Sequence, residues 1–309
     1  MAERFQHLAN MPPESQWFAN LNSPQTRRAY ESDIRAFMAF VGIAQPLEFR
    51  AVTRGHVLAW RANLEQQGLA GSTIRRKLAA LSSLYDYLCD ANAVTHSPVK
   101  GVKRPKVESY EGKTPTLGDA QARQLLDAPP GDTLKGQRDR TILSVLLHHA
   151  LRREELTQLR VKDLNQARRG VPHLRVHGKG GKLRYIPAHP ETWRRVADYL
   201  KTAGHAKDQD GPLFRPVRNP RAGHTATALT PASGVYSEVV VRYMREIGIA
   251  GERMGPHALR ATAATSALKN NADIVRVQEW LGHASISTTR AYDRRHSNPG
   301  DSPTFHVIY

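Results

Sequence analysis

The 309-residue sequence contains a single cysteine, Cys89, which excludes an intramolecular disulfide and a zinc site built from cysteines. Cys89 lies in the apolar phase of the stretch LSSLYDYLCD, so we expect it to be a core residue. The sequence also lacks a signal peptide and any apolar run long enough to span a bilayer. These absences predict a cytoplasmic protein with no membrane partner.

Motifs of several familiar enzyme classes are also missing. The sequence has no GxxxxGK[ST] loop for nucleotide phosphates, no GxSxG turn for a nucleophilic serine and no HExxH pair for catalytic zinc. Its 14 histidines are not paired at metal-ligand spacing, and its acidic residues form no recognisable metal-binding cluster. We therefore predict neither a cofactor nor a metal ion, while a dispersed carboxylate triad leaves a metal-dependent nuclease or transposase open.

Acidic residues are scarce relative to basic ones. Lys and Arg number 45 against 28 Asp and Glu, and the resulting formal net charge of +17 favours a polyanionic partner, above all nucleic acid. The excess is not confined to a tail. Fourteen basic and 9 acidic residues precede residue 110, a net of +5, and the other 31 basic and 19 acidic residues give +12.

Residues 1–95 are expected to form a small helical domain. Ser23 and Pro24 are typical of a helix start, and apolar residues follow them at helical spacing. A second helix is expected within residues 52–68, where the pattern runs to a glycine, and a third begins at Ser72. Three short helices with apolar stripes are enough to enclose one core.

Basic residues stand off the apolar stripes of these helices. Arg27 and Arg28 lie beside the stripe of the first helix, and Arg75, Arg76 and Lys77 occupy the first turns of the third. Positive charge at a helix start opposes the helix dipole, so the second group has a local cost. It forms either a solvated face or a phosphate-binding cluster. We assign all five residues to DNA binding as candidates.

Residues 96–118 are rich in Pro, Gly, Lys and Thr and show no sustained periodicity. We interpret this segment as a basic interdomain linker. Lys103 and Arg104 would allow it to follow a phosphate backbone while the two domains hold opposite sides of a duplex. The predicted architecture is therefore a two-domain DNA clamp.

Residues 119–309 are expected to form a second domain that is again mostly helical. One segment differs: HLRVHGKGGKLRYIPA alternates apolar and polar residues on both sides of the glycine-rich turn at residues 178–181. This pattern predicts a β-hairpin that presents Lys179 at its turn. The fold class is therefore mainly α, with a small β-sheet in the second domain.

Four stretches of the second half carry residue types suited to phosphate chemistry: ALRREEL, HGKGGKLR, HALR and LGHASISTTRAY. Each alone is most often a surface ion pair, a charged hairpin or a solvated pair. Together they resemble the tyrosine recombinase (phage integrase) family. Its catalytic domain carries an arginine in a G-L-R-x-x-E-L turn, a lysine on a β-hairpin, an H-x-x-R helix, and L-G-H followed nine residues later by a tyrosine.

The resemblance extends over almost the whole chain, with small departures. The N-terminal stretches SPQTRRAYESDIRAF and STIRRKLAALSSLYDYL are similar to the helices of that family's core-binding domain. Ala150 stands where the family usually has glycine, and Arg153 replaces a common apolar residue. Neither departure removes a catalytic group. Ala150 would be strained if its position requires a positive φ.

The resemblance implies six catalytic residues: Arg152, Lys179, His257, Arg260, His283 and Tyr292. Chemistry supports Tyr292 as the nucleophile, because breaking and rejoining DNA without metal or nucleotide energy requires a covalent phosphoryl link to the protein. About one free tyrosine in a thousand is ionised at neutral pH, so a base such as His257 must take the proton.

The remaining residues have the roles expected around a phosphoryl transition state. Arg152 and Arg260 can hold the non-bridging oxygens with planar guanidinium groups, and His283 can donate a further hydrogen bond. Lys179 is expected to protonate the leaving 5′ oxygen, with Lys182 of the same turn as its rival. No metal takes part in this scheme.

The implied function is site-specific DNA recombination through a 3′-phosphotyrosine intermediate and a Holliday junction. The implied partners are double-stranded DNA and further copies of the chain in a tetramer on two DNA sites, with accessory DNA-bending or directionality proteins, in the nucleoid of a bacterium or on a mobile element. The apolar end of residues 297–309 is expected either to dock on the neighbouring protomer or to fold back on its own domain. A type IB topoisomerase and a non-catalytic DNA-binding protein are the alternatives.

Overall fold

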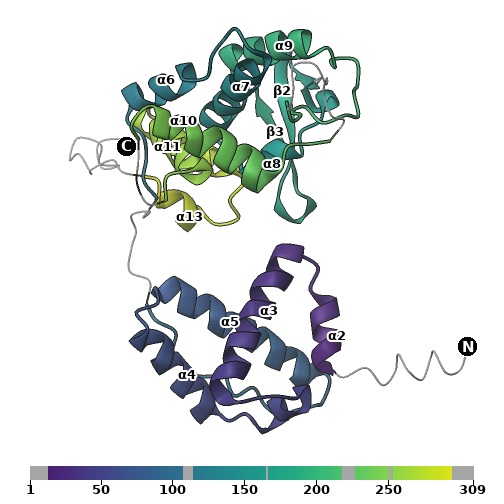
Figure 1. Ribbon diagram of the computed structural model, residues 1–309. Coiled ribbons are helices and arrows are strands. Elements are labelled where there is room, and N and C mark those ends of the chain that lie inside the picture. The colour runs from purple at the N-terminus through teal and green to yellow at the C-terminus, as the bar shows by residue number, and fades with distance from the viewer. Residues whose placement is uncertain are drawn as a thin grey trace, which may run out of the picture. The chain divides into compact units, whose positions relative to one another are not determined.

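The computed structural model describes residues 13–106, 114–164, 166–217, 227–249, 251 and 253–293. Of Lys179 it describes the backbone only. The chain forms two compact units that divide between residues 108 and 109 (Figure 1). Each unit buries a hydrophobic core of its own. No helix in the described ranges is both long and apolar enough to cross a membrane.

The first unit consists of helices around one aromatic-rich core. Its elements are α2 (Pro13–Asn20), α3 (Pro24–Val41), the 3-10 helix η1 (Pro46–Ala51), α4 (Arg54–Gln66) and α5 (Gly71–Asp90). Helix α5 packs against α2, α3 and α4. The ring of Phe37 meets that of Trp60 edge-on, with the centroids 5.0 Å apart. Burial of such rings is the main stabilising term of a helical domain of this size.

The helix boundaries of the first unit follow local sequence signals. The hydroxyl of Ser23 accepts a hydrogen bond from the Thr26 N–H, and Pro24 occupies the first turn of α3, which confirms the predicted start. Gly42 ends α3 with a φ of 79°, a conformation that favours glycine. Cys89 was expected in the core but is only half-buried, because it lies at the edge of the apolar stripe of α5.

The second unit combines helices with a small sheet. Its elements are α6 (Asp119–Asp127), α7 (Leu134–His149), α8 (Arg153–Thr157), η2 (Val161–Leu164), β1 (Gln166–Arg168), β2 (Val171–His177), η3 (Lys179–Gly181), β3 (Leu183–Pro187), α9 (Pro190–Ala203), η4 (Pro231–Val241), α10 (Arg242–Glu246), α11 (Pro256–Lys269), α12 (Ile274–Leu281) and α13 (Ile286–Arg290). Here η4 is a π-helix, a rare form that is often found beside functional sites.

The predicted hairpin is confirmed. Strands β2 and β3 pair antiparallel, with Leu174 opposite Ile186, and the glycine-rich turn joins them. β1 adds an edge strand in the order β1-β2-β3. The sequence did not reveal β1, because its three residues, QAR, are too few to show alternation. The fold is thus mainly α with one small antiparallel sheet.

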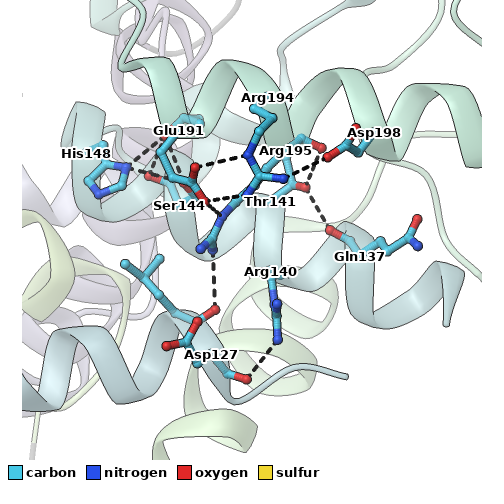
Figure 2. A network of polar contacts seen from close by, with 12 residues as sticks. Asp127, Gln137, Arg140, Thr141, Ser144, His148, Glu191, Arg194, Arg195 and Asp198 are labelled. Atoms are coloured by element: carbon cyan, nitrogen blue, oxygen red, sulfur yellow. Dashed lines mark hydrogen bonds and ion pairs between the residues drawn. The ribbon is translucent and has the colours of Figure 1, made fainter. Parts of the chain in front are cut away.

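Helix α7 is the centre of the second unit and packs against both α9 and α11 (Figure 1). Figure 2 shows a polar network along the α7–α9 contact, in which Arg195 of α9 binds Glu191 on its own helix and the Leu126 carbonyl of α6. Ser144 of α7 hydrogen bonds to Thr192 of α9 at 2.8 Å. The network holds α7 in a defined place, and the C-terminal end of α7 leads directly into the site described next.

Candidate active site

The turn after α7 positions the first arginine of the site. Ala150 ends the helix with φ 51° and ψ 33°, so the strain predicted for a residue in place of glycine is present. Arg152 follows as the N-cap of α8, and its backbone N–H and its Nη1 donate to the two carboxylate oxygens of Glu155 at 2.8 and 2.7 Å. Glu155 is buried, so its carboxylate fixes both the backbone and the side chain of Arg152.

A second arginine is buried beneath this turn. Arg260 of α11 is 1% exposed and donates from Nη1 to the Ala150 carbonyl and from Nη2 to the Leu281 carbonyl. Burial and the nearby Arg152 charge lower the pKa of Arg260 to about 10, so the guanidinium stays protonated at neutral pH. Backbone carbonyls from two distant segments therefore hold this cation in place.

His283 is held between Arg260 and Thr289. Its Nε2 lies 3.0 Å from Arg260 Nη2, and its Nδ1 lies 3.0 Å from Thr289 Oγ1. A guanidinium can only donate, so Nε2 accepts and the ring proton is on Nδ1. Burial, followed by the charges of Arg260 and Arg152, lowers the pKa of His283 to about 4. In this arrangement Nε2 of the neutral ring accepts a hydrogen bond from Arg260. Nε2 would have to lose that bond and take up a proton before it could donate to a phosphate.

Tyr292 combines a packed ring with a directed hydroxyl. The ring is 6% exposed and stacks on His283 at a centroid distance of 5.9 Å, and Thr265 Oγ1 donates to the Tyr292 carbonyl at 3.1 Å. The hydroxyl lies 3.4 Å from His257 Nε2. Burial, followed by the charges of Arg260 and Arg152, lowers the pKa of His257, so this imidazole is neutral at pH 7 and can accept a proton.

The hairpin contributes the remaining predicted residues. Lys179 lies in its turn, where Gly180 and Gly181 have positive φ values, and its side chain lies outside the described part of the chain. Lys182 is exposed and lines a pocket of about 570 Å³ together with Arg152 and His283. An ammonium from this turn is thus available beside the arginines.

A second pocket lies on the other side of Arg152. It measures about 440 Å³ and is lined by Arg152, His257, Arg260 and the half-exposed Tyr236 of η4. The pocket is cationic, and His257 in its lining contacts the Tyr292 hydroxyl, an arrangement that suits a phosphodiester. Among the described residues, no group of three or more His, Cys, Asp or Glu side chains is placed to hold a metal ion.

Sequence reasoning missed two contributors to this site. Arg184 of β3 binds Glu155, and Thr289 of α13 binds His283. Both follow motif residues closely, Arg184 at the end of HGKGGKLR and Thr289 in the hydroxyl-rich run before Tyr292. Only the folded geometry shows that they contact catalytic candidates.

The DNA-binding candidates of the first unit differ in the exposure of their side chains and in the partners that these side chains bind. Arg27 and Arg28 are exposed, and Arg27 donates to the Leu21 carbonyl at 2.8 Å. Lys103 and Arg104 are exposed as well. Their side chains are therefore accessible to a polyanion.

The cluster at the start of α5 departs from the expected fully exposed turn. Arg75 is exposed, but Arg76 and Lys77 both bind the buried carboxylate of Asp33 on α3, and the Lys77 side chain is only 14% exposed. Two of the three cations therefore compensate a buried charge. The sequence alone did not pair them with a carboxylate more than 40 residues away.

Comparison with known proteins gives consistent matches along the chain. The phage integrase family model matches residues 115–298, and the phage integrase N-terminal SAM-like domain model matches residues 16–92. Tyrosine recombinase XerC of Pelobacter propionicus is 37% identical over 273 residues, which cover 87% of this chain and 84% of the relative. XerC of Pseudomonas fluorescens is 32% identical, with 87% and 85% covered.

Solved structures show the same fold. A lambda integrase dimer, residues 75–356, bound to a COC′ core site has a TM-score of 0.66 at 17% identity, and the match covers 92% of this chain and 95% of that one. XerH recombinase bound to difH substrate in a pre-cleavage complex has a TM-score of 0.63 at 20% identity, with 91% and 79% covered.

Proposed function

Because the chain belongs to the phage integrase family and is a site-specific tyrosine recombinase that cleaves and rejoins DNA, we propose that Tyr292 is its nucleophile. The observation that carries this proposal is the position of the Tyr292 hydroxyl, 3.4 Å from a neutral His257 and beside a pocket lined by Arg152 and Arg260. That distance is long for a hydrogen bond, as is common before substrate binds.

In the proposed reaction Tyr292 Oη attacks the phosphorus and its proton passes to His257 Nε2. The bond from phosphorus to the 5′ oxygen breaks, which leaves a 3′-phosphotyrosine link and a free 5′ hydroxyl. Arg152 and Arg260 hold the non-bridging oxygens. Arg260 has five N–H donors, of which three are used by Ala150, Leu281 and His283, so donors remain for the phosphate.

The leaving 5′ oxygen requires a proton, which we assign to the ammonium of Lys179. Its position in a glycine turn supports the proposal, because positive φ values at the two following residues allow a tight, exposed tip. Lys182, which lines the pocket beside Arg152 and His283, is the competing donor. Substitution of each lysine separates the two.

We propose further that the chain acts on double-stranded DNA as a two-domain clamp, with residues 1–95 as the core-binding domain, 96–118 as the basic linker and 119–309 as the catalytic domain. Solved relatives bound to DNA support the DNA partner. The phosphate contacts we assign to the first domain and the linker are Arg27, Arg28, Arg75, Arg76, Lys77, Lys103 and Arg104.

We also propose that four copies assemble on two sites and exchange strands through a Holliday junction in the bacterial cytoplasm, with DNA-bending or directionality proteins as additional partners. The expected role of residues 297–309 in joining protomers lies outside the described residues. A native gel that counts protomers on paired-site DNA tests the assembly. The reported relatives and structures are recombinases and integrases, which favours recombination over topoisomerase activity or DNA binding alone.

The experiment that tests the function is a map of protein-linked 3′ DNA ends across the host replicon, with Tyr292→Phe as its control. The wild-type protein should give covalent ends at a discrete site. Tyr292→Phe should give none while DNA affinity is nearly unchanged, because the substitution removes the reacting oxygen and no charge. Strand joining by the variant would contradict the assignment.

A further inference from the structure

Arg184 is the second residue of β3 and lies at the base of the hairpin turn. It pairs with Val176 in the sheet, and the turn between the strands is closed by a 2.7 Å hydrogen bond from the Gly178 N–H to the Lys182 carbonyl. Its side chain leaves the hairpin and reaches α8. Nη1 and Nη2 donate to the two oxygens of Glu155 at 2.9 and 2.8 Å.

Glu155 is therefore shared by two arginines. It accepts the two-pronged contact from Arg184 and two further hydrogen bonds from the backbone and side chain of Arg152. Burial alone would raise its pKa, but the hydrogen bonds from Arg184 and the Arg152 backbone hold the pKa below its usual value. An ionised carboxylate with four charge-assisted or backbone donors is a strong and directional link.

The guanidinium of Arg184 also packs between two glycines. A Cβ at Gly178, at the base of the hairpin turn, would lie 3.2 Å from Nη1, and a Cβ at Gly282, just before His283, would lie 3.3 Å from the same atom. One side chain thus contacts the hairpin base, the turn of Arg152 and the turn of His283. Among the described residues, the Arg184 side chain therefore joins the hairpin to the turn that carries Arg152 and to the turn that carries His283.

We infer that Arg184 is a positioning residue for the leaving-group step, which fixes the lysine-bearing hairpin against Arg152 through Glu155. This inference rests on the proposed function. As Tyr292 Oη bonds to phosphorus and its proton passes to His257, the bond to the 5′ oxygen breaks and that oxygen takes a proton from the hairpin ammonium. The ammonium can donate its proton only if the turn is held close to the phosphate bound by Arg152. The two hydrogen bonds from Arg184 to Glu155 hold the turn there.

A sulfur substitution separates positioning from folding. A nicked duplex of the mapped site is prepared with a bridging 5′ oxygen or with a bridging 5′ sulfur, and single-turnover cleavage is measured for both. A thiolate leaves without a proton, so loss of the general acid slows the oxygen substrate selectively. The variants are Arg184→Met, Arg184→Lys, Lys179→Ala and Lys182→Ala.

Arg175→Met is the matched control, because Arg175 lies on β2, is partly exposed and binds a different buried carboxylate, Asp163. Arg184→Met is expected to slow the oxygen substrate about 100-fold, the lower end of a general-acid contribution, and the sulfur substrate only a few-fold. The cleavage rate of Arg184→Lys on the oxygen substrate should lie between the rates of Arg184→Met and of the wild-type protein. Arg175→Met should leave the sulfur-to-oxygen rate ratio unchanged.

Equal slowing of both substrates by Arg184→Met and Arg184→Lys would overturn the inference and leave Arg184 a structural residue. If neither lysine variant is rescued by sulfur, the hairpin supplies no general acid and the inference also fails. Failure of the proposed function is distinct, since the wild-type protein would then form no covalent adduct on either DNA. If Arg184→Met does not fold, Arg184→Lys alone decides between the outcomes.

Discussion

The two halves of the active site are built in different ways. The buried half consists of Arg260, His283 and Tyr292. Arg260 donates to the Leu281 carbonyl and to His283, and Thr265 donates to the Tyr292 carbonyl. The hairpin half is an exposed turn with two glycines of positive φ, attached near its base by Arg184. If the proposed reaction holds, charge stabilisation is preorganised in the buried half, whereas proton delivery depends on the contact from Arg184 to Glu155.

Apart from loss of the Tyr292 hydroxyl itself, the largest expected effect concerns the hairpin half. Lys179→Ala should lower single-turnover cleavage by about 10²–10⁴-fold, as expected for loss of a general acid. It should not change the thermal unfolding temperature, because an exposed turn adds little packing. Cleavage and thermal melts of Lys179→Ala and Lys182→Ala are the measurements. A larger loss in Lys182→Ala would transfer the role to that residue.

A somewhat smaller effect should separate the two arginines. Arg260→Met and Arg152→Met should each slow cleavage by about 10²–10³-fold, the cost of one transition-state donor. Arg260→Met should also lower the free energy of unfolding more, by roughly 1–3 kcal/mol, because it leaves the buried Ala150 and Leu281 carbonyls without a donor, whereas Glu155 keeps its bonds to Arg184 in Arg152→Met. Urea unfolding of both variants checks this. Equal destabilisation would contradict the contrast between a buried and a half-exposed arginine.

His257, beside the buried half, should determine the response to acid. Desolvation, followed by the charges of Arg260 and Arg152, lowers its pKa, so His257 is neutral at pH 7 and in the proposed reaction accepts the Tyr292 proton. As the pH falls through the folded pKa, below the ordinary 6.5, the base becomes protonated and the cleavage rate should drop about tenfold per pH unit. The His257→Gln variant should cleave slowly and should not show this decrease in rate at low pH. A decrease in the wild-type cleavage rate that begins above pH 6.5 would be inconsistent with a lowered pKa of His257.

The smallest effect is expected in the first unit. Arg75→Ala should reduce the salt dependence of DNA binding by up to about 0.9 in log–log slope, the value for one phosphate contact. Arg76 and Lys77 compensate Asp33, so their alanine variants are best compared in an Asp33→Asn background, which leaves no unpaired buried carboxylate. Titrations at several salt concentrations measure the slopes. Unchanged slopes would show that the cluster serves only the contact between α3 and α5.

Local signals in the sequence were sufficient for several elements. Ser23 with Pro24 predicted the start of α3, and the glycine turn between alternating segments predicted the β2–β3 hairpin. These features depend on neighbouring residues, and a single sequence contains that information. The strain at Ala150 was predicted too, because the family resemblance placed a glycine there.

Contacts across long stretches of chain were not predictable in this way. Glu155 was noted only as part of a motif, yet it joins Arg152 to Arg184, 29 residues further along. Thr289 looked like one hydroxyl residue among several, and Asp33 gave no sign of its pairing with α5. Partners of this kind are selected by tertiary packing, which a periodic pattern does not encode.

The carbonyl contacts of Arg260 have a consequence for biosynthesis. The guanidinium bridges Ala150 and Leu281, which are separated by more than 130 residues, and the proposed nucleophile Tyr292 follows eleven residues after the second of them. A nascent chain on the ribosome cannot complete this bridge until translation has passed Leu281. A polypeptide interrupted before that point contains neither the ordered cation nor Tyr292, so in the proposed reaction an unfinished product of translation cannot cleave DNA.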